Sequence, residues 1–257
     1  MSEDSGKKPV YWMPRQPKSP AEGADLAKHP NTFQLSYPAM LRARVAEILD
    51  EDLGFGISAR LRKSVSADGS PIPLMSYGFV EYVAGLDLSS FSVLEFGGGN
   101  STLFWADRTR SVLTFEHDRG WHGTVEGQMP ANVDLRLIDQ DAYAKQAASL
   151  DQSFDLIIID CAASRYDCAK AIEGKLAAGG LVVLDNSDWY PNTAAALREQ
   201  GLIQVDFPDF RPDHWIRCCT SIFLHSEFRP KPRQGQLPLP VIGGKLLAEE
   251  NGWDKPS

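Results

Sequence analysis

The chain has 257 residues, of which 43% are hydrophobic and 23% are charged, and these values are ordinary for one globular domain. The formal net charge of −8 argues against broad binding to nucleic-acid backbones, because such binding depends on basic patches. We therefore expect a small-molecule substrate. A local patch of Arg60, Arg62 and Lys63 leaves a modified tRNA or a peptide open as alternatives. No apolar run reaches the ~18 residues of a membrane span and no signal-peptide core is present, so we expect a cytoplasmic protein.

The first part of the chain differs in composition from the rest. Residues 1–35 are rich in proline, lysine, serine and glycine, and we expect them to be disordered. A helix is predicted over Tyr37–Leu49, because Leu41, Val45 and Leu49 are spaced to form one apolar face. The aromatic segment from Ile72 to Leu86 is then expected to enter the first helix of the sheet domain.

Residues 93–101 have the sequence Val-Leu-Glu-Phe-Gly-Gly-Gly-Asn-Ser, which predicts a buried strand followed by a tight turn into a helix. Glycine at Gly97 and Gly99 permits close approach of a ligand, so we expect valine at either position to abolish ligand binding in a protein that still folds. Glu95 precedes the glycines, where it would repel a pyrophosphate and favour a cationic ligand. Together with the absence of Gly-x-Gly-x-x-Gly, this argues against a NAD-dependent oxidoreductase. A glycine-rich loop without a ligand is the alternative.

A second strand is predicted over Ser111–Glu116 and ends in an acid 19 residues after Gly97. In nucleotide-binding βαβ units, an Asp or Glu about 20 residues beyond the glycine turn accepts hydrogen bonds from a ribose. This spacing, with helix-like residues 103–108 between the two strands, predicts that Glu116 binds a ribose rather than water.

Further strands are predicted at 133–138, 154–160, 181–185, 202–207 and 220–225, with helical patterns between most of them. This alternation is typical of a parallel, doubly wound α/β sheet. Gly179 and Gly180 are expected to end a helix and turn the chain into the fifth strand. Ligands bind beyond the carboxyl ends of such strands. Acids at these ends are expected to share one rim: Glu95, Glu116, Asp141, Asp160 and Asp185.

The glycine segment resembles the first motif of class I S-adenosylmethionine-dependent methyltransferases, acid-x-Gly-x-Gly-x-small, here Glu95 to Ser101. The resemblance implies a mostly parallel seven-stranded, Rossmann-like sheet with a helical N-terminal cover, and S-adenosylmethionine as the cofactor. The residues that it assigns to cofactor binding are Glu95, Gly97, Gly98, Gly99, Asn100, Glu116, His117, Asp141, Ala142 and Asp160. In family members an Asp-Ala pair lies beside the adenine amino group, and Asp141-Ala142 matches it. A helix N-cap is the alternative for Asp141.

A metal site is a second expectation. The oxygen-bearing side chains of Asp160, Asp185 and Asn186 suit a hard cation such as Mg²⁺ or Ca²⁺. The same segments resemble the metal-dependent O-methyltransferases of catechol type, although those enzymes usually carry a lysine where this chain has Ala163. Asn186 capping the following helix is the alternative. Cys161 follows Asp160 and is expected near the site.

The segment Pro208–Arg217 is expected to be a loop that contacts the substrate. His214 is a candidate catalytic base beside Asp160, because histidine titrates near neutral pH. Trp189, Tyr190 and Trp215 are candidates for an aromatic wall around an aromatic or cationic substrate. The alternative is a hairpin loop packed by its own aromatic residues.

Taken together, these features predict three segments: a disordered start at 1–35, a methyltransferase domain at 36–227 and an irregular, proline-rich tail at 228–257. The expected reaction is methyl transfer from S-adenosylmethionine to a small or medium nucleophile, with O-methylation preferred. Two alternatives stay open. One is an aminopropyl-type transferase on the same fold, and the other is a non-catalytic interaction protein that has kept the fold.

Overall fold

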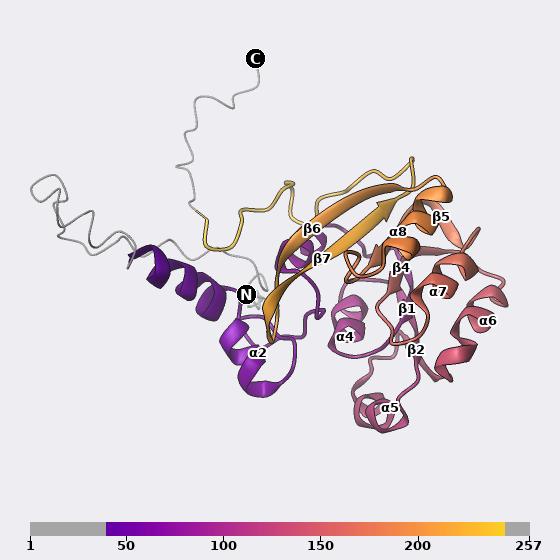
Figure 1. Cartoon of the computed structure of the whole chain (residues 1–257), viewed down its shortest axis with the longest axis horizontal. Coiled ribbons are helices and arrows are strands. Elements are labelled where there is room, and N and C mark those ends of the chain that lie inside the picture. Colours follow the sequence, from indigo (N-terminus) through magenta and orange to yellow (C-terminus); the bar gives the residue numbers. More distant parts are fainter. Residues whose placement is uncertain (1–39, 245–257) are drawn as a thin grey trace, which may run out of the picture.

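The computed structural model describes residues 40–244, so the expectations for residues 1–35 and for the end of the tail lie outside the described residues. Seven strands form one sheet in the order β3-β2-β1-β4-β5-β7-β6 (Figure 1). Their bounds are β1 Ser92–Phe96, β2 Ser111–Glu116, β3 Val133–Leu137, β4 Phe154–Ile159, β5 Leu176–Leu184, β6 Ile203–Arg211 and β7 His214–Leu224. The first five strands are parallel, and β7 is antiparallel to both β5 and β6. The predicted doubly wound, mostly parallel sheet is therefore confirmed.

Helices cover both faces of this sheet and form two separate apolar cores. The described helices are α2 Phe55–Leu61, α3 Tyr77–Ala84, α4 Asn100–Ala106, α5 Arg119–Val125, α6 Tyr143–Ala148, α7 Arg165–Ala171 and α8 Pro191–Glu199, with short turns η1 Ile48–Asp52, η2 Glu126–Gln128 and η3 Gln140–Ala142. On one face, Phe79 of α3 and Trp105 of α4 belong to one core cluster. On the other, Tyr143 of α6, Cys168 of α7 and Leu197 of α8 belong to the second. Since both faces are covered, residues 156–159 of β4 and 181–184 of β5 form unbroken apolar runs.

The strand order determines where a ligand-binding crevice can form. The chain winds from β1 outward to β2 and β3, then returns to β4 on the other side of β1. At such a reversal the loops after the two central strands diverge and leave a crevice beyond their carboxyl ends. Here the crevice must lie between the β1–α4 turn and the β4–α7 loop.

The N-terminal helix is confirmed over its described part, since residues 40–47 are helical and continue into η1. Leu41 and Val45 on its expected apolar face are exposed, so within residues 40–244 that face is not buried.

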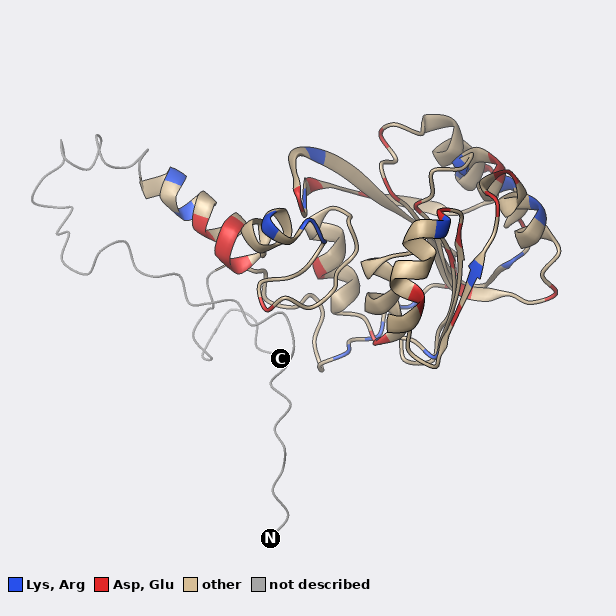
Figure 2. Cartoon of the chain, turned by 90° about the horizontal axis from the view of Figure 1, so that it is seen from below, with Lys and Arg blue, Asp and Glu red and all other residues tan. Residues whose placement is uncertain are grey.

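None of the described helices is long and apolar enough to span a membrane. Basic and acidic residues are interspersed along the ribbon (Figure 2).

The expectation for Gly179 and Gly180 was wrong, because both residues lie inside β5. A Cβ at Gly180 would lie 2.7 Å from the carbonyl oxygen of Asp155 on the neighbouring strand. Gly179 has φ +76°, and the pairing register of β4 and β5 shifts between Phe154 and Leu156. The glycines therefore allow an irregularity within the strand pair rather than a turn before it.

The segment Pro208–Arg217 was predicted to be a loop and instead continues β6 and β7 into one long hairpin that turns at Pro212 and Asp213. Pro208 is compatible with a strand here because β6 is the edge strand, where one side of the backbone needs no hydrogen-bond donor. Trp215 is 90% exposed, so it does not pack the hairpin. Figure 1 shows the hairpin tip extending towards α2.

The described part of the tail, residues 228–244, is irregular and lies on the protein surface. Its backbone is held to the loop after α3 by hydrogen bonds from Asp87 N to Lys231 O and from Arg233 N to Gly85 O. Leu237 packs against the first core cluster.

Candidate functional site

The turn between β1 and α4 is built around Gly97. This residue has φ +92°, a conformation that side-chain-bearing residues rarely adopt, and its N–H donates to Phe115 O at 2.8 Å. A Cβ at Gly97 would also overlap the backbone carbonyl oxygen of Asp160, at the end of β4. Gly97 is thus required both for the turn and for the close approach of the two loops.

Glu95 does not face the crevice. It is 0% exposed, and its carboxylate accepts three hydrogen bonds of 2.6 to 2.8 Å, from the hydroxyls of Ser101, Thr102 and Thr114. The Thr102 hydroxyl oxygen in turn accepts from Gly99 N. Burial raises the pKa of Glu95 to about 7, although the three hydroxyls oppose this rise. Glu95 therefore supports the turn from beneath, and the expected direct contact with a cationic ligand has no counterpart in the geometry.

Glu116 connects the turn to the end of β2. Its Oε2 accepts from Gly98 N at 2.9 Å, and its Oε1 accepts from the N–H groups of His117 and Asp118, both at 2.7 Å. The Glu116 side chain also lines the adjoining cavity. The predicted ribose contact stays a prediction.

A cavity of about 280 Å³ opens beyond the turn. Its lining brings together seven of the residues predicted to bind the cofactor, and also Cys161: Gly97, Gly98, Gly99, Asn100, Glu116, His117, Asp160 and Cys161. The remaining predicted residues, Glu95, Asp141, Ala142, Asp185, Asn186 and His214, are not part of the lining. Asp141 is exposed in η3, so nothing in the geometry supports its expected place beside an adenine.

Several lining residues were missed by the sequence analysis. Trp121 of α5 donates from its indole nitrogen to Gly98 O at 2.8 Å and lies over the glycine turn. The segment after α2 contributes Arg62 and Lys63, which the sequence analysis had taken as a surface patch. Asn100 ties this segment to the turn by donating to Ser64 O at 2.8 Å. Only tertiary contact brings them together, and the sole local signal was the pair of adjacent basic residues.

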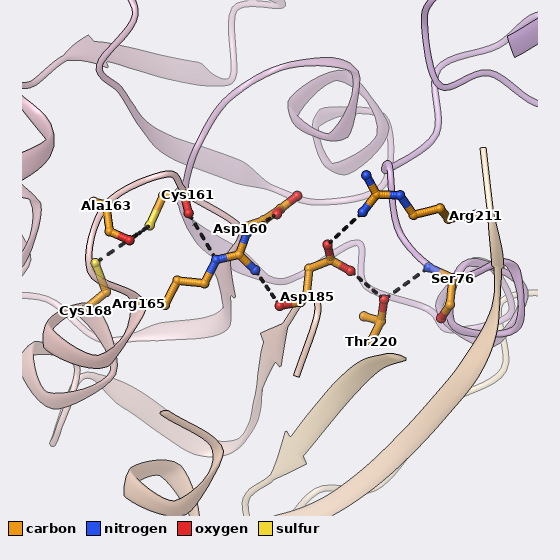
Figure 3. Close-up of polar contacts among 9 residues, drawn as sticks. All are labelled: Ser76, Asp160, Cys161, Ala163, Arg165, Cys168, Asp185, Arg211 and Thr220. Carbon is orange, nitrogen blue, oxygen red and sulfur yellow. Dashed lines mark hydrogen bonds and ion pairs between the residues drawn. The ribbon is translucent and has the colours of Figure 1, made fainter. Parts of the chain in front are cut away.

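Next to the cavity, the predicted metal ligands are held by arginines (Figure 3). Asp160 Oδ1 accepts from Arg165 at 3.0 Å, and the same guanidinium donates to the carbonyl oxygen of Asp185. The carboxylate of Asp185, which is 1% exposed, accepts from the Thr220 hydroxyl at 2.7 Å and lies 3.8 Å from Arg211.

Asn186 belongs to the same network. In the amide orientation that satisfies its neighbours, it donates to Asp185 at 2.7 Å and accepts from Arg211 at 3.2 Å. It does not cap the following helix, because α8 begins at Pro191 after Tyr190. The helix-cap alternative for Asn186 was therefore wrong, and its role as a metal ligand stays a prediction.

This arrangement does not fit a divalent cation. Burial raises the pKa of both Asp160 and Asp185, and the positive charges beside them are the Arg165 and Arg211 guanidinium groups. Within residues 40–244, no group of three or more His, Cys, Asp or Glu side chains is arranged to hold a metal ion. A cation would have to displace the guanidinium groups of Arg165 and Arg211, which already form ion pairs with Asp160 and Asp185.

We therefore expect Mg²⁺ and Ca²⁺ to leave the thermal unfolding midpoint of the protein unchanged, and EDTA to have no effect on it, because a ligand stabilises only the state that binds it. Differential scanning fluorimetry with each cation measures this directly. A cation-dependent rise in the midpoint that disappears in Asp160→Asn would contradict the expectation.

Comparisons with known proteins add the following. No protein-family model and no curated protein sequence matches the chain. Among solved structures, it is similar to a precorrin-6y C5,15-methyltransferase from Geobacter metallireducens GS-15, with 12% identity, TM-score 0.45 and coverage of 54% of this chain and 82% of that one. A putative O-methyltransferase from Klebsiella pneumoniae gives 18% identity, TM-score 0.43 and coverage of 52% and 72%. A spermidine synthase from Thermotoga maritima gives 12% identity, TM-score 0.44 and coverage of 57% and 56%.

These similarities are too distant to assign a substrate. The strand order, the antiparallel β7 and the glycine turn at the end of β1 are observed in this chain itself. By this topology, the chain has the Rossmann-like fold of class I methyltransferases.

Proposed function

We propose that the protein is a S-adenosylmethionine-dependent methyltransferase that acts on a small or medium nucleophile, preferably on an oxygen atom. The observation that carries the proposal is the cavity at the strand reversal, where the glycine turn, Glu116 and Asp160 meet. Such a site, at the carboxyl ends of parallel strands, suits a nucleoside cofactor.

The charges in the cavity lining support a zwitterionic cofactor. Arg62 and Lys63 lie on the side of the N-terminal segment, whereas Glu116 and Asp160 come from strand ends. S-adenosylmethionine carries a carboxylate for the first pair, and ribose hydroxyls, an ammonium and a sulfonium for the second. Decarboxylated S-adenosylmethionine, the aminopropyl donor, lacks the carboxylate, so the two cations favour methyl transfer over the aminopropyl alternative.

Bound S-adenosylmethionine supplies the reactive methyl group, and the protein has to hold the nucleophile in line with it. Asp160 is the described carboxylate that both lines the cavity and lies next to the Asp185 network. Arg165 donates a hydrogen bond to one carboxylate oxygen of Asp160. Burial raises the pKa of Asp160 and so favours proton uptake by its carboxylate. These properties suit a group that accepts the proton of an acceptor hydroxyl, which is the reason for preferring O-methylation. His214 stays a prediction as a base.

Isothermal titration calorimetry with S-adenosylmethionine and S-adenosylhomocysteine tests the proposal. Both are expected to bind with one-to-one stoichiometry and to compete with each other. Absence of binding by either compound would reject the proposal and favour the non-catalytic alternative.

We expect Arg62→Asn and Lys63→Gln each to weaken binding of S-adenosylmethionine by about 1.5 to 3 kcal/mol, the range for hydrogen bonds to charged groups. Asparagine is chosen for Arg62 because this residue has φ +50° and asparagine tolerates that conformation. Binding of decarboxylated S-adenosylmethionine should change much less, because it has no carboxylate to lose contact with. Arg60→Gln is the matched control, since Arg60 is exposed on α2 and outside the cavity lining. Equal losses for both cofactors would contradict the assignment of these cations.

A further inference from the structure

One face of the β6–β7 hairpin packs beside Asp185 and the residues that contact its carboxylate, which we call the Asp185 network: Asn186, Arg211 and Thr220. Thr220 and Cys218 of this face are buried, and Thr220 donates to Asp185. Nearer the tip, Arg211 and His214 are partners in the pairing of the two strands. The pairing register shifts between Phe210 and Arg211, and beyond this shift the two residues are neighbours across the hairpin.

Two nitrogen atoms of this pair have no hydrogen-bond partner among the described residues, although both are buried: Nε of Arg211 and Nδ1 of His214. The Arg211 side chain is only 11% exposed. Buried polar groups are nearly always hydrogen-bonded, and an unpaired one costs about 1 to 3 kcal/mol. Two unpaired nitrogens on paired residues therefore point to a missing partner, and an acceptor group serves both when the His214 proton is on Nδ1.

The ion pair of Arg211 with Asp185 is longer than that of Arg165 with Asp160. Its guanidinium lies 3.8 Å from Asp185, beyond hydrogen-bond distance, and its closer contact at 3.2 Å is to the neutral amide oxygen of Asn186. By contrast, Arg165 makes a 3.0 Å hydrogen bond to Asp160. In Figure 3 the Arg211 guanidinium and the Asp160 carboxylate project to the same side of Asp185. Arg211 thus presents donors on the side that carries the cavity-lining acid.

We propose that Arg211 and His214 bind an oxyanion of the methyl acceptor, a carboxylate or a phosphate ester, and so determine which acceptors the enzyme takes. This inference rests on the proposed function, because it places the acceptor between the hairpin and Asp160. Arginine suits the role, since its planar fork of donors matches carboxylate and phosphate oxygens. The nucleophilic atom of the acceptor would then lie towards Asp160, away from the anion.

The test is a direct binding measurement on the full-length protein saturated with S-adenosylhomocysteine. Benzoate, phenyl phosphate and the neutral benzamide are titrated separately and followed by protein-observed NMR. Benzoate or phenyl phosphate is expected to bind at least tenfold more tightly than benzamide, and the tighter of the two identifies the anion class. Arg211→Gln should remove that preference, whereas Arg211→Lys, which keeps the charge but not the fork, should retain part of it.

Arg217→Gln is the matched control, because Arg217 is an exposed arginine of the same hairpin whose guanidinium donates to Pro208 O. It should bind the anions as the wild type does. Unchanged affinity for S-adenosylhomocysteine in Arg211→Gln shows that this variant is folded, and His214→Ala provides a second variant that should weaken anion binding. Equal binding of anion and amide, no binding of either anion, or a preference that survives in Arg211→Gln would overturn the inference. Loss of S-adenosylhomocysteine binding by the wild type would instead reject the proposed function.

Discussion

Gly97→Ala is expected to lower the free energy of unfolding by about 2 to 5 kcal/mol and to abolish binding of S-adenosylhomocysteine. The first part of this loss comes from φ +92°, which is unfavourable for alanine, and the second from overlap of the new Cβ with the Asp160 carbonyl oxygen. Relief of that overlap moves the β1–α4 turn or the β4–α7 loop, and both line the cavity. Urea unfolding and calorimetry measure the two effects separately.

Gly99→Ala is the matched control within the same turn. Gly99 has φ 164°, an extended conformation open to any residue, and a Cβ there would lie 3.5 Å from the Trp121 indole, an ordinary contact. Its free energy of unfolding should stay within about 1 kcal/mol of the wild type, the usual range for a tolerated small substitution. The sequence-based expectation that Gly97 and Gly99 act alike, through ligand binding alone, is revised accordingly. Equal stability of the two variants would show that the approach of the loops is unimportant.

Glu116→Ala is expected to weaken binding of S-adenosylhomocysteine by about 2 to 4 kcal/mol, which is about 30- to 1,000-fold. The variant loses the expected ribose contact and also the acceptor for three backbone N–H groups, those of Gly98, His117 and Asp118. Glu116→Gln should lose less, but it cannot be silent, because its single oxygen can serve only one of the two sets of N–H groups. Calorimetry gives both affinities.

Glu126→Ala serves as the comparison, since Glu126 is an exposed acid in nearby η2 and lies outside the cavity lining. Glu126→Ala should bind S-adenosylhomocysteine with the same affinity as the wild type. Wild-type affinity in Glu116→Ala would show that the ribose is bound elsewhere and that the turn holds its shape without the carboxylate.

Much of the sheet was predictable because its signals are local. The strand Ser111–Glu116 was predicted with its observed bounds, and the apolar centres of β4 and β5 predicted burial on both faces. Prediction from the sequence failed where one sequence pattern is compatible with two local structures. Gly179 and Gly180 are compatible with a turn or with an irregular strand, and only the close approach of Asp155 decided between them. Pro208 likewise suggested a loop, because the sequence does not show which strand will lie at the edge of the sheet.

By itself, the sequence determined the glycine turn after β1 and the acid after β2, because backbone conformation and chain spacing place both at one edge of the sheet. Only the tertiary structure decided what each acid does. Glu95 is opposite Thr114 in the register of β1 and β2, so its carboxylate meets hydroxyl groups under the turn. Asp160 and Asp185, which were predicted as metal ligands, form ion pairs with arginines from α7 and from the hairpin. The charge state and partner of a side chain depend on groups distant in sequence, and chain spacing alone does not specify them.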